Sequence, residues 1–172
     1  TACAGTFVTF TATPTNGGTT PTYQWYNGAS EISGETSDTY TTNSLVDGDQ
    51  ISVVMTSNAT CISGNPATSN TLTMTINPLP SVSFSGLSAS YCATGIPATL
   101  TGSPAGGTFS GTGISGNTFD PAAAGVGGPY TITYTYTNEN GCTNTSTQDV
   151  SVTASVSVDY ANLQWPPTGT IC

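Results

Sequence analysis

The chain has 172 residues, with nine Asp and Glu and no Lys, Arg or His, so its formal charge is −9. In an average protein about a tenth of the residues are Lys or Arg. A chain without cations cannot neutralise the phosphates of a nucleic acid or dock on an anionic membrane through a basic patch. It also lacks a His base and a Lys nucleophile. We therefore predict a protein that is not an enzyme and does not bind nucleic acid.

Strands are predicted along the whole chain. Thr is the most abundant residue, with 35 copies, and its β-branched side chain favours extended backbone. Apolar and polar residues alternate in short runs, bounded by Gly, Pro, Asn and Asp. In chain order these runs are 6–13, 22–27, 50–57, 70–76, 81–85, 98–102, 107–111, 130–137, 147–153 and 155–160. No segment keeps a period of 3.6 residues. The sequence predicts an all-β fold built from β-sandwiches.

The cysteines indicate an internal repeat. Cys61 and Cys142 are 81 residues apart, and each follows a long strand and an Asn-containing turn. Cys92 and Cys172 are 80 residues apart, and each follows a short lead-in, as Cys3 does. The repeat predicts two sandwich domains in a row, at 1–77 and 78–154, with 155–172 as the leading strand of a following repeat. The Pro-rich segment 77–80 is the expected linker.

The first predicted domain lacks the strand that 81–85 supplies to the second, because only two residues precede Cys3. Segment 155–172 has the sequence expected of that strand. We therefore expect residues 155–165 to pair with a neighbouring repeat of the same protein, in a longer chain or by strand donation between subunits of a homopolymer. Since no initiator Met or signal peptide is visible, we expect a mature or internal fragment.

Five cysteines without a CxxC pair or a His favour disulfides in an oxidising, extracellular setting over a zinc site. The simplest pairing lies within domains, as Cys3–Cys61 and Cys92–Cys142. This pairing conflicts with a sandwich in which successive strands run in opposite directions. There the turn after the first strand and the turn before the last strand lie at opposite ends, and an eight-residue strand separates these ends by about 26 Å. Bridged Cα atoms lie within about 7 Å. The alternative joins successive domains, as Cys3–Cys142, with Cys61 and Cys172 paired to neighbouring repeats.

A family resemblance covers nearly the whole chain. The string TLTGSPAGGTFSGTGISGNTFDPAAAGVGGPYTITYTYTNENGC, from Thr99 to Cys142, resembles the PKD-like and Ig-like repeats of giant Bacteroidota surface proteins. These include gliding-motility-type adhesins secreted by the type IX system. The runs TFVTFTA, TYQWYNG and QISVVMTSNATC resemble a related Ig-like repeat. The resemblance implies a secreted structural segment of an extracellular filament or a cell-surface adhesin.

Aromatic residues supply the candidate core and the candidate ligand contacts. Trp25 lies on a strand where Ig-like sandwiches bury an aromatic side chain, and its expected counterpart in the second domain is Phe109. Tyr134 lies on the core-facing side of strand 130–137. The stacking of a polysaccharide on Tyr23 or Tyr26 is the alternative function, that of a carbohydrate-binding accessory module of a secreted protein or hydrolase.

Metal and membrane contacts have little support. Asp47 and Asp49 flank Gly48 and are a weak calcium candidate, because calcium takes six to eight oxygen ligands. A structural turn is the favoured interpretation, so no cofactor is predicted. No catalytic residue is predicted either, because the pattern brings no pair of carboxylates to a cleft. No run of 18 apolar residues occurs, so we expect no membrane insertion.

Overall fold

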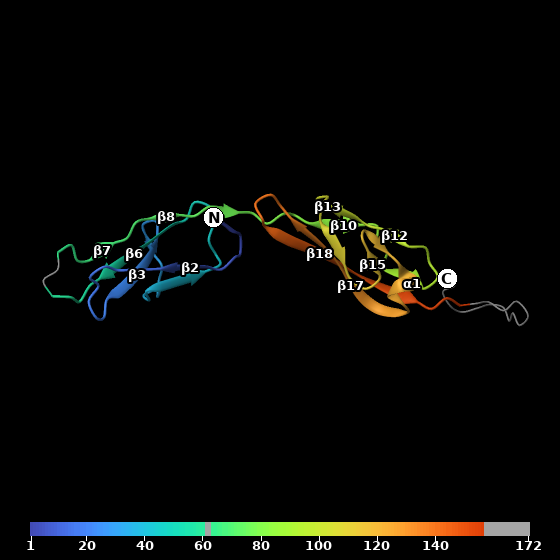
Figure 1. Ribbon diagram of the computed structural model, residues 1–172, viewed down its shortest axis with the longest axis horizontal. Coiled ribbons are helices and arrows are strands. Elements are labelled where there is room, and N and C mark those ends of the chain that lie inside the picture. Colours follow the sequence, from blue (N-terminus) through green and yellow to red (C-terminus); the bar gives the residue numbers. More distant parts are fainter. Residues whose placement is uncertain (61–62, 157–172) are drawn as a thin grey trace, which may run out of the picture. The chain divides into compact units, whose positions relative to one another are not determined.

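The computed structural model describes residues 1–60 and 63–156. The chain divides into two compact units, Thr1–Leu79 and Pro80–Cys172, shown in Figure 1. Their boundary lies in the Pro-rich segment that was predicted as a linker. Apart from one short helix, the regular structure of the described residues is β-strand, so the predicted all-β fold class is confirmed. No helix in these residues is long and apolar enough to cross a membrane.

Unit 1 consists of short strands in two main sheets. One sheet pairs β2 with β5, and the other has the order β4-β3-β6-β7, with β8 also paired to β6. A separate parallel pair joins β1 to β9. The strands are β1 (Ala2–Cys3), β2 (Val8–Thr11), β3 (Thr22–Asn27), β4 (Ser30–Glu31), β5 (Thr39–Thr42), β6 (Gln50–Thr56), β7 (Ala67–Thr68), β8 (Leu72–Thr73) and β9 (Ile76–Asn77).

The two main sheets of unit 1 bury one aromatic core between them. Alternation along β2 and β5 turns Phe10 and Tyr40 inward, where their rings stack with centroids 5.8 Å apart. Trp25 on β3 is 3% exposed, and its ring lies 5.9 Å from that of Tyr40. The indole Nε1 donates a hydrogen bond of 2.9 Å to the carbonyl of Ser37, so the buried polar atom is satisfied. Trp25 therefore occupies the core, the position that the resemblance to Ig-like sandwiches implies.

Unit 2 is organised around a long hairpin. Its four-stranded sheet has the order β11-β18-β17-β14, and smaller sheets pair β10 with β13 and join β12, β16 and β15. The elements are β10 (Ser83–Ser85), β11 (Ser90–Cys92), β12 (Ala98–Thr99), β13 (Thr101–Ser103), β14 (Thr108–Ser110), β15 (Ile114–Ser115), β16 (Thr118–Phe119), α1 (Pro121–Ala124), β17 (Gly127–Thr137) and β18 (Thr143–Thr153). The hairpin turns at Asn138–Cys142, where Asn138 Oδ1 accepts hydrogen bonds from the amides of Asn140 and Cys142.

The core of unit 2 forms where the small sheets face this hairpin. Ile132 and Tyr134 on β17 are 0% and 2% exposed. Phe109 on β14 is half-buried and packs its ring 4.6 Å from that of Tyr134. β14 pairs with β17 as β3 pairs with β6 in unit 1. Phe109 therefore has the position of Trp25. Among the described residues of unit 2, the most buried aromatic side chains are Tyr134 and Phe119.

Helix α1 was not predicted. Its four residues are too few for a 3.6-residue period to show. The local signals are nevertheless present, because Asp120 caps the helix by accepting a hydrogen bond from the amide of Ala122. Pro121 starts the helix and Gly125, with φ of 78°, ends it. The residues DPAAAG therefore specify one helical turn through capping alone.

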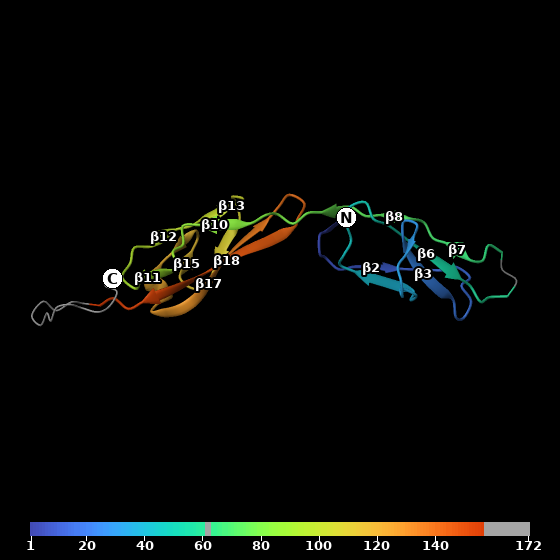
Figure 2. The same ribbon diagram turned by 180° about the vertical axis from the view of Figure 1, so that it is seen from behind.

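The cysteine-bearing lead-ins are strands rather than turns. β1 runs parallel to β9, with Cys3 opposite Asn77. β11 runs parallel to β18, with Cys92 opposite Thr153. Figure 2 labels both strands. The first strand of unit 1 and the second strand of unit 2 are therefore each paired side by side with the last described strand of their unit. Runs of two or three residues carry no readable alternation, so tertiary pairing alone defines them.

Candidate functional site

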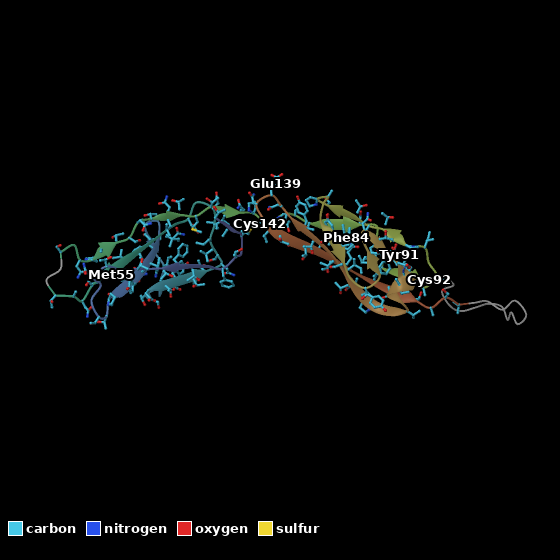
Figure 3. All side chains as sticks on the ribbon, in the orientation of Figure 1. Met55, Phe84, Tyr91, Cys92, Glu139 and Cys142 are labelled. Carbon is cyan, nitrogen blue, oxygen red and sulfur yellow. The ribbon has the colours of Figure 1, made fainter. Side chains whose placement is uncertain are left out.

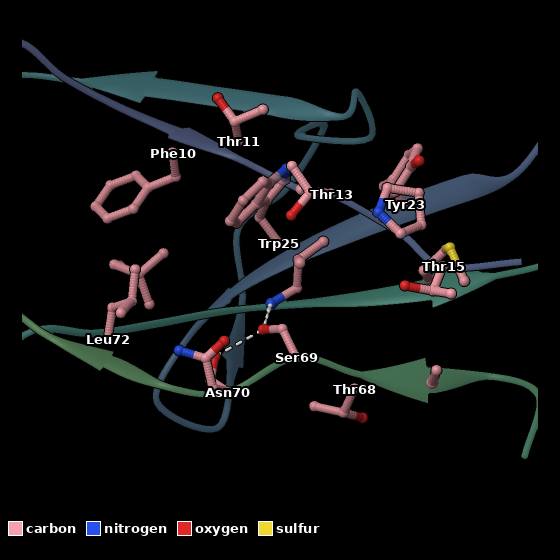
Figure 4. A pocket seen from close by; sticks show the side chains of 16 residues that line it. Phe10, Thr11, Thr13, Thr15, Tyr23, Trp25, Thr68, Ser69, Asn70 and Leu72 are labelled. Atoms are coloured by element: carbon pink, nitrogen blue, oxygen red, sulfur yellow. Dashed lines mark hydrogen bonds between the residues drawn. The ribbon is translucent and has the colours of Figure 1, made fainter. Parts of the chain in front are cut away.

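A groove of about 320 Å³ opens in unit 1 between the end of β2 and strands β7 and β8. Figure 4 shows Phe10 and Trp25 on one side and Leu72 on the other. Ala12 and Tyr23 also line it, together with Ser69. None of its lining residues is charged. A site of this kind binds apolar side chains rather than ions.

The wall formed by β7 and β8 contains a β-bulge. Val54 is opposite Thr68 and Ile51 is opposite Leu72, so one extra residue lies on the outer strand. Ser69 fills the gap in the ladder: its amide donates to the carbonyl of Val53 at 2.9 Å, and its Oγ accepts from the amide of Val53 at 3.0 Å. The predicted strand 70–76 did not include this residue. The polar pair Ser69-Asn70 within an alternating run is the signal that marks it.

The candidate ligand tyrosines lie on opposite faces of β3. Tyr23 is half-buried, lines the groove and packs against the core. Tyr26 is also half-buried. It lies three residues further along β3, so its side chain is on the opposite face of the strand. Neither therefore presents a fully exposed ring, and a role for either in polysaccharide binding remains a prediction.

The carboxylates of the Asp47-Gly48-Asp49 turn bind protein groups. Asp47 Oδ1 accepts a hydrogen bond of 2.9 Å from the amide of Ile76. Asp49 accepts from the amide of Val46 at 2.9 Å through Oδ2 and from Asn27 Nδ2 at 2.8 Å through Oδ1. The turn that leads into β6 is thereby linked to β3 through Asn27 and to β9 through Ile76. Within residues 1–60 and 63–156, no group of three or more His, Cys, Asp or Glu side chains is arranged to hold a metal ion.

The charge of the chain lies at its surface. Of the nine acidic residues, Asp159 lies outside the described residues, and none of the other eight is buried. A buried carboxylate without a cation beside it would carry a large desolvation cost. A chain with no side-chain cation therefore keeps its carboxylates in water.

Cys3, Cys92 and Cys142 are disulfide-bonded. Cys142 directly precedes β18, which runs for 11 residues from Thr143 to Thr153. Cys92 is opposite Thr153 at the far end of that strand, and Figure 3 shows the two cysteines at opposite ends of unit 2. Eleven residues of strand span roughly 35 Å, whereas bridged Cα atoms lie within about 7 Å. The predicted Cys92–Cys142 bridge is therefore wrong, because the register keeps the two residues apart.

The predicted Cys3–Cys61 pairing involves a residue that the structure does not describe. Cys61, the expected partner of Cys3, lies outside the described residues, as does Cys172. Cys3 lies on β1 beside Asn77, and Cys142 is fully buried. The Cys3–Cys142 alternative remains a prediction.

Comparisons with known proteins find similarity among solved structures. No protein-family model matches the chain, so the resemblance to PKD-like and Ig-like repeats depends on the quoted residues alone. No curated protein matches it in sequence. Among solved structures, a similar chain is a Ca²⁺-stabilised adhesin that helps an Antarctic bacterium reach out and bind ice. The two chains are 18% identical, with a TM-score of 0.40. The match covers 88% of this chain and 44% of the adhesin chain, so this chain spans less than half of that structure.

Proposed function

We propose that this chain is a load-bearing structural segment of an extracellular filament or cell-surface adhesin. The observation that carries the proposal is the parallel pairing of β1 with β9 and of β11 with β18. In both units a strand near the beginning lies beside the last strand. Such an arrangement suits a protein that transmits tension along its chain.

Tension on the two ends of unit 1 pulls β1 and β9 in opposite directions along their length. In unit 2 the strand β10 precedes β11, so β11 and β18 are loaded in the same way once β10 has been pulled away. The hydrogen bonds between them are then loaded together in shear, whereas an antiparallel hairpin opens one bond at a time. In unit 2 the amide of Ser151 donates to the carbonyl of Ala89 at 3.0 Å, and that of Ala93 donates to the carbonyl of Thr153 at 2.9 Å. In unit 1 the amides of Ala2 and Ala4 donate to Thr75 and Asn77 in the same way. Both units therefore have a ladder that resists stretching.

The extracellular location is supported by the cysteines. All three that the structure describes are disulfide-bonded, and disulfides persist in oxidising compartments. The PKD-like string from Thr99 to Cys142 favours a surface protein of the Bacteroidota and secretion by the type IX system. An all-negative surface also opposes lateral association over about 8–10 Å at moderate salt.

Single-molecule stretching of the full chain, held by its two ends in reducing buffer, tests the proposal. Ala93→Pro removes the amide that bonds to Thr153, so we expect the unfolding force of unit 2 to fall. Ile114→Ala is the matched control, because Ile114 is half-buried on β15 and outside the parallel pair. For an equal loss of unfolding free energy, Ile114→Ala should lower the unfolding force of unit 2 less than Ala93→Pro does. Equal losses of force in the two variants would contradict a shear-loaded ladder.

The alternative function is polysaccharide binding, favoured by the aromatic residues that line the groove. A glycan array probed with the chain, with and without a chelator, separates the two functions. Specific binding that is lost in Tyr23→Ala or Tyr26→Ala would favour the accessory module. The absence of binding, together with a high unfolding force, would favour the structural segment.

A further inference from the structure

Unit 2 shows how the gap between its four-stranded sheet and the small sheets that face it is closed. β10 pairs antiparallel with β13, with Phe84 opposite Gly102. The Phe84 side chain is 7% exposed and meets the ring of Phe109 edge-on, with centroids 5.3 Å apart. From the opposite sheet, Gln148 on β18 donates a hydrogen bond of 2.7 Å to the carbonyl of Phe84. β10 therefore occupies the gap and bonds to both of its sides.

Unit 1 has the same edge without such a strand. β2 follows the cysteine-bearing β1 as β13 follows β11, and it turns Val8, Phe10 and Ala12 toward the core. Its only sheet partner among the described residues is β5. The groove of about 320 Å³ lies along its other side, between β2 and the strands β7 and β8. The position that β10 fills in unit 2 is therefore the groove of unit 1.

The free edge of β2 has main-chain groups available for pairing. The amide of Ala12 donates to the carbonyl of Asp38 at 2.8 Å, so this residue pair is hydrogen-bonded. Pairs alternate in an antiparallel ladder, so Phe10 also bonds to Tyr40, and Thr9 and Thr11 direct their amides and carbonyls away from β5. Thr9 and Thr41 form a non-hydrogen-bonded pair, in which opposite side chains lie closer together. The hydrogen bond of 2.8 Å between their Oγ1 atoms agrees with this. This edge is a template for another strand.

We propose that this groove accepts residues 155–165 of a second copy of the chain. The occupant is identified by its sequence: Ser155–Val158 reads SVSV, and Ser81–Phe84, which leads into the internal strand of unit 2, reads SVSF. Val156 is 58% exposed in its own chain, where it follows the last strand. An added antiparallel strand supplies main-chain hydrogen bonds, and its alternate side chains fill the apolar pockets.

The register follows from unit 2. Phe84 faces Gly102, and the inward residues Ala98, Leu100 and Gly102 correspond in order to Val8, Phe10 and Ala12. Val158 should therefore enter the groove opposite Ala12, with Val156 on the same side. Ser157 should face solvent. The proposal is independent of the load-bearing role, since a strand can dock whether or not the assembly carries tension.

A labelled peptide of residues 155–165 tests the groove directly. It is titrated into the full chain carrying Val158→Asp, whose own tail cannot compete, and binding is followed by fluorescence anisotropy. We expect saturable binding that weakens about tenfold or more when Thr11→Pro removes an amide from the free edge. Thr39→Pro is the matched control, because Thr39 is opposite Thr11 on the far edge of the same two-stranded sheet. Near-UV circular dichroism checks that both variants fold.

Assembly of the full chain gives the second readout. Wild type and Ser157→Asp should form oligomers by light scattering, whereas Val158→Asp alone and Thr11→Pro alone should be monomers. Mixing those two variants should give a heterodimer and nothing larger, because one retains only the acceptor and the other only the donor. A peptide that does not bind, a Thr39→Pro variant that weakens binding as much as Thr11→Pro, or a wild-type monomer at all concentrations would overturn the proposal. A different segment found in the groove would do the same.

Discussion

Gly102 lies directly against the ring of Tyr134: a Cβ atom built on this glycine would be 2.0 Å from Cζ of the tyrosine. Tyr134 is 2% exposed and its ring is held by Phe109 at a centroid distance of 4.6 Å, so it cannot move aside. We expect Gly102→Ala to lower the free energy of unfolding of unit 2 by about 2–3 kcal/mol through overpacking. Denaturant unfolding measures this loss.

Gly17→Ala is the control for that substitution. A Cβ at Gly17 would meet its nearest atoms at 3.4 Å, an ordinary contact, and its φ is outside the left-handed region. The same chemical change should therefore be nearly neutral there. An unchanged stability in Gly102→Ala would show that β13 can move away from Tyr134.

The hydroxyl of Tyr134 provides a second test in unit 2. It accepts a hydrogen bond of 2.8 Å from the amide of Gly107 and donates to the carbonyl of Pro104. Tyr134→Phe keeps the ring but leaves both main-chain groups without this partner, so we expect a loss of about 1–3 kcal/mol. Tyr136→Phe should cost little, because the Tyr136 hydroxyl makes no hydrogen bond with the described residues. Thermal unfolding of both variants would distinguish a hydrogen-bonding role from a packing role.

Alternation of side chains predicted much of this fold. It gave β3 with its observed bounds, Thr22–Asn27, and it turned Tyr134 toward the core, where the structure has it. The core position of Trp25 was implied by the resemblance to Ig-like repeats. It missed β5, Thr39–Thr42, whose sequence TYTT has one aromatic residue among threonines. The burial of that strand comes from Tyr40 stacking on Phe10, which is a contact between segments 30 residues apart in sequence.

The candidate site was less predictable than the fold. The groove of unit 1 forms only when β2 and the bulge at Ser69 face each other across Trp25, and no local pattern contains that relationship. The Cys92–Cys142 pairing failed for a similar reason. The two cysteines were paired because they lie in the same predicted domain. In the structure, the parallel register of β11 on β18 places Cys92 beside Thr153, far from Cys142.

The Asp47–Asp49 turn gives a prediction on metal binding. Asp49→Ala removes the acceptor for the amide of Val46 and for Asn27, so we expect a loss of about 1–3 kcal/mol in unfolding free energy. The loss should be the same with calcium and with a chelator, since the carboxylate oxygens already bind protein donors. Glu139→Ala, at an exposed position of the β17–β18 turn, should change little. A melting temperature that rises with calcium in the wild type, but not in Asp49→Ala, would instead establish a calcium site.

The disulfide pairing is the last prediction. Cys142 is disulfide-bonded, and the strand register separates it from Cys92 by roughly 35 Å. We therefore expect the alternative bridge from Cys142 to Cys3, which would join the two units covalently and limit their separation under load. Trypsin is of no use here, because the chain has no Lys or Arg, so the map requires chymotrypsin or pepsin under non-reducing conditions. A linked Cys3–Cys142 peptide that disappears after reduction is the expected result. A linked Cys92–Cys142 peptide would mean that β11 does not pair with β18 in the register that also supports the load-bearing proposal.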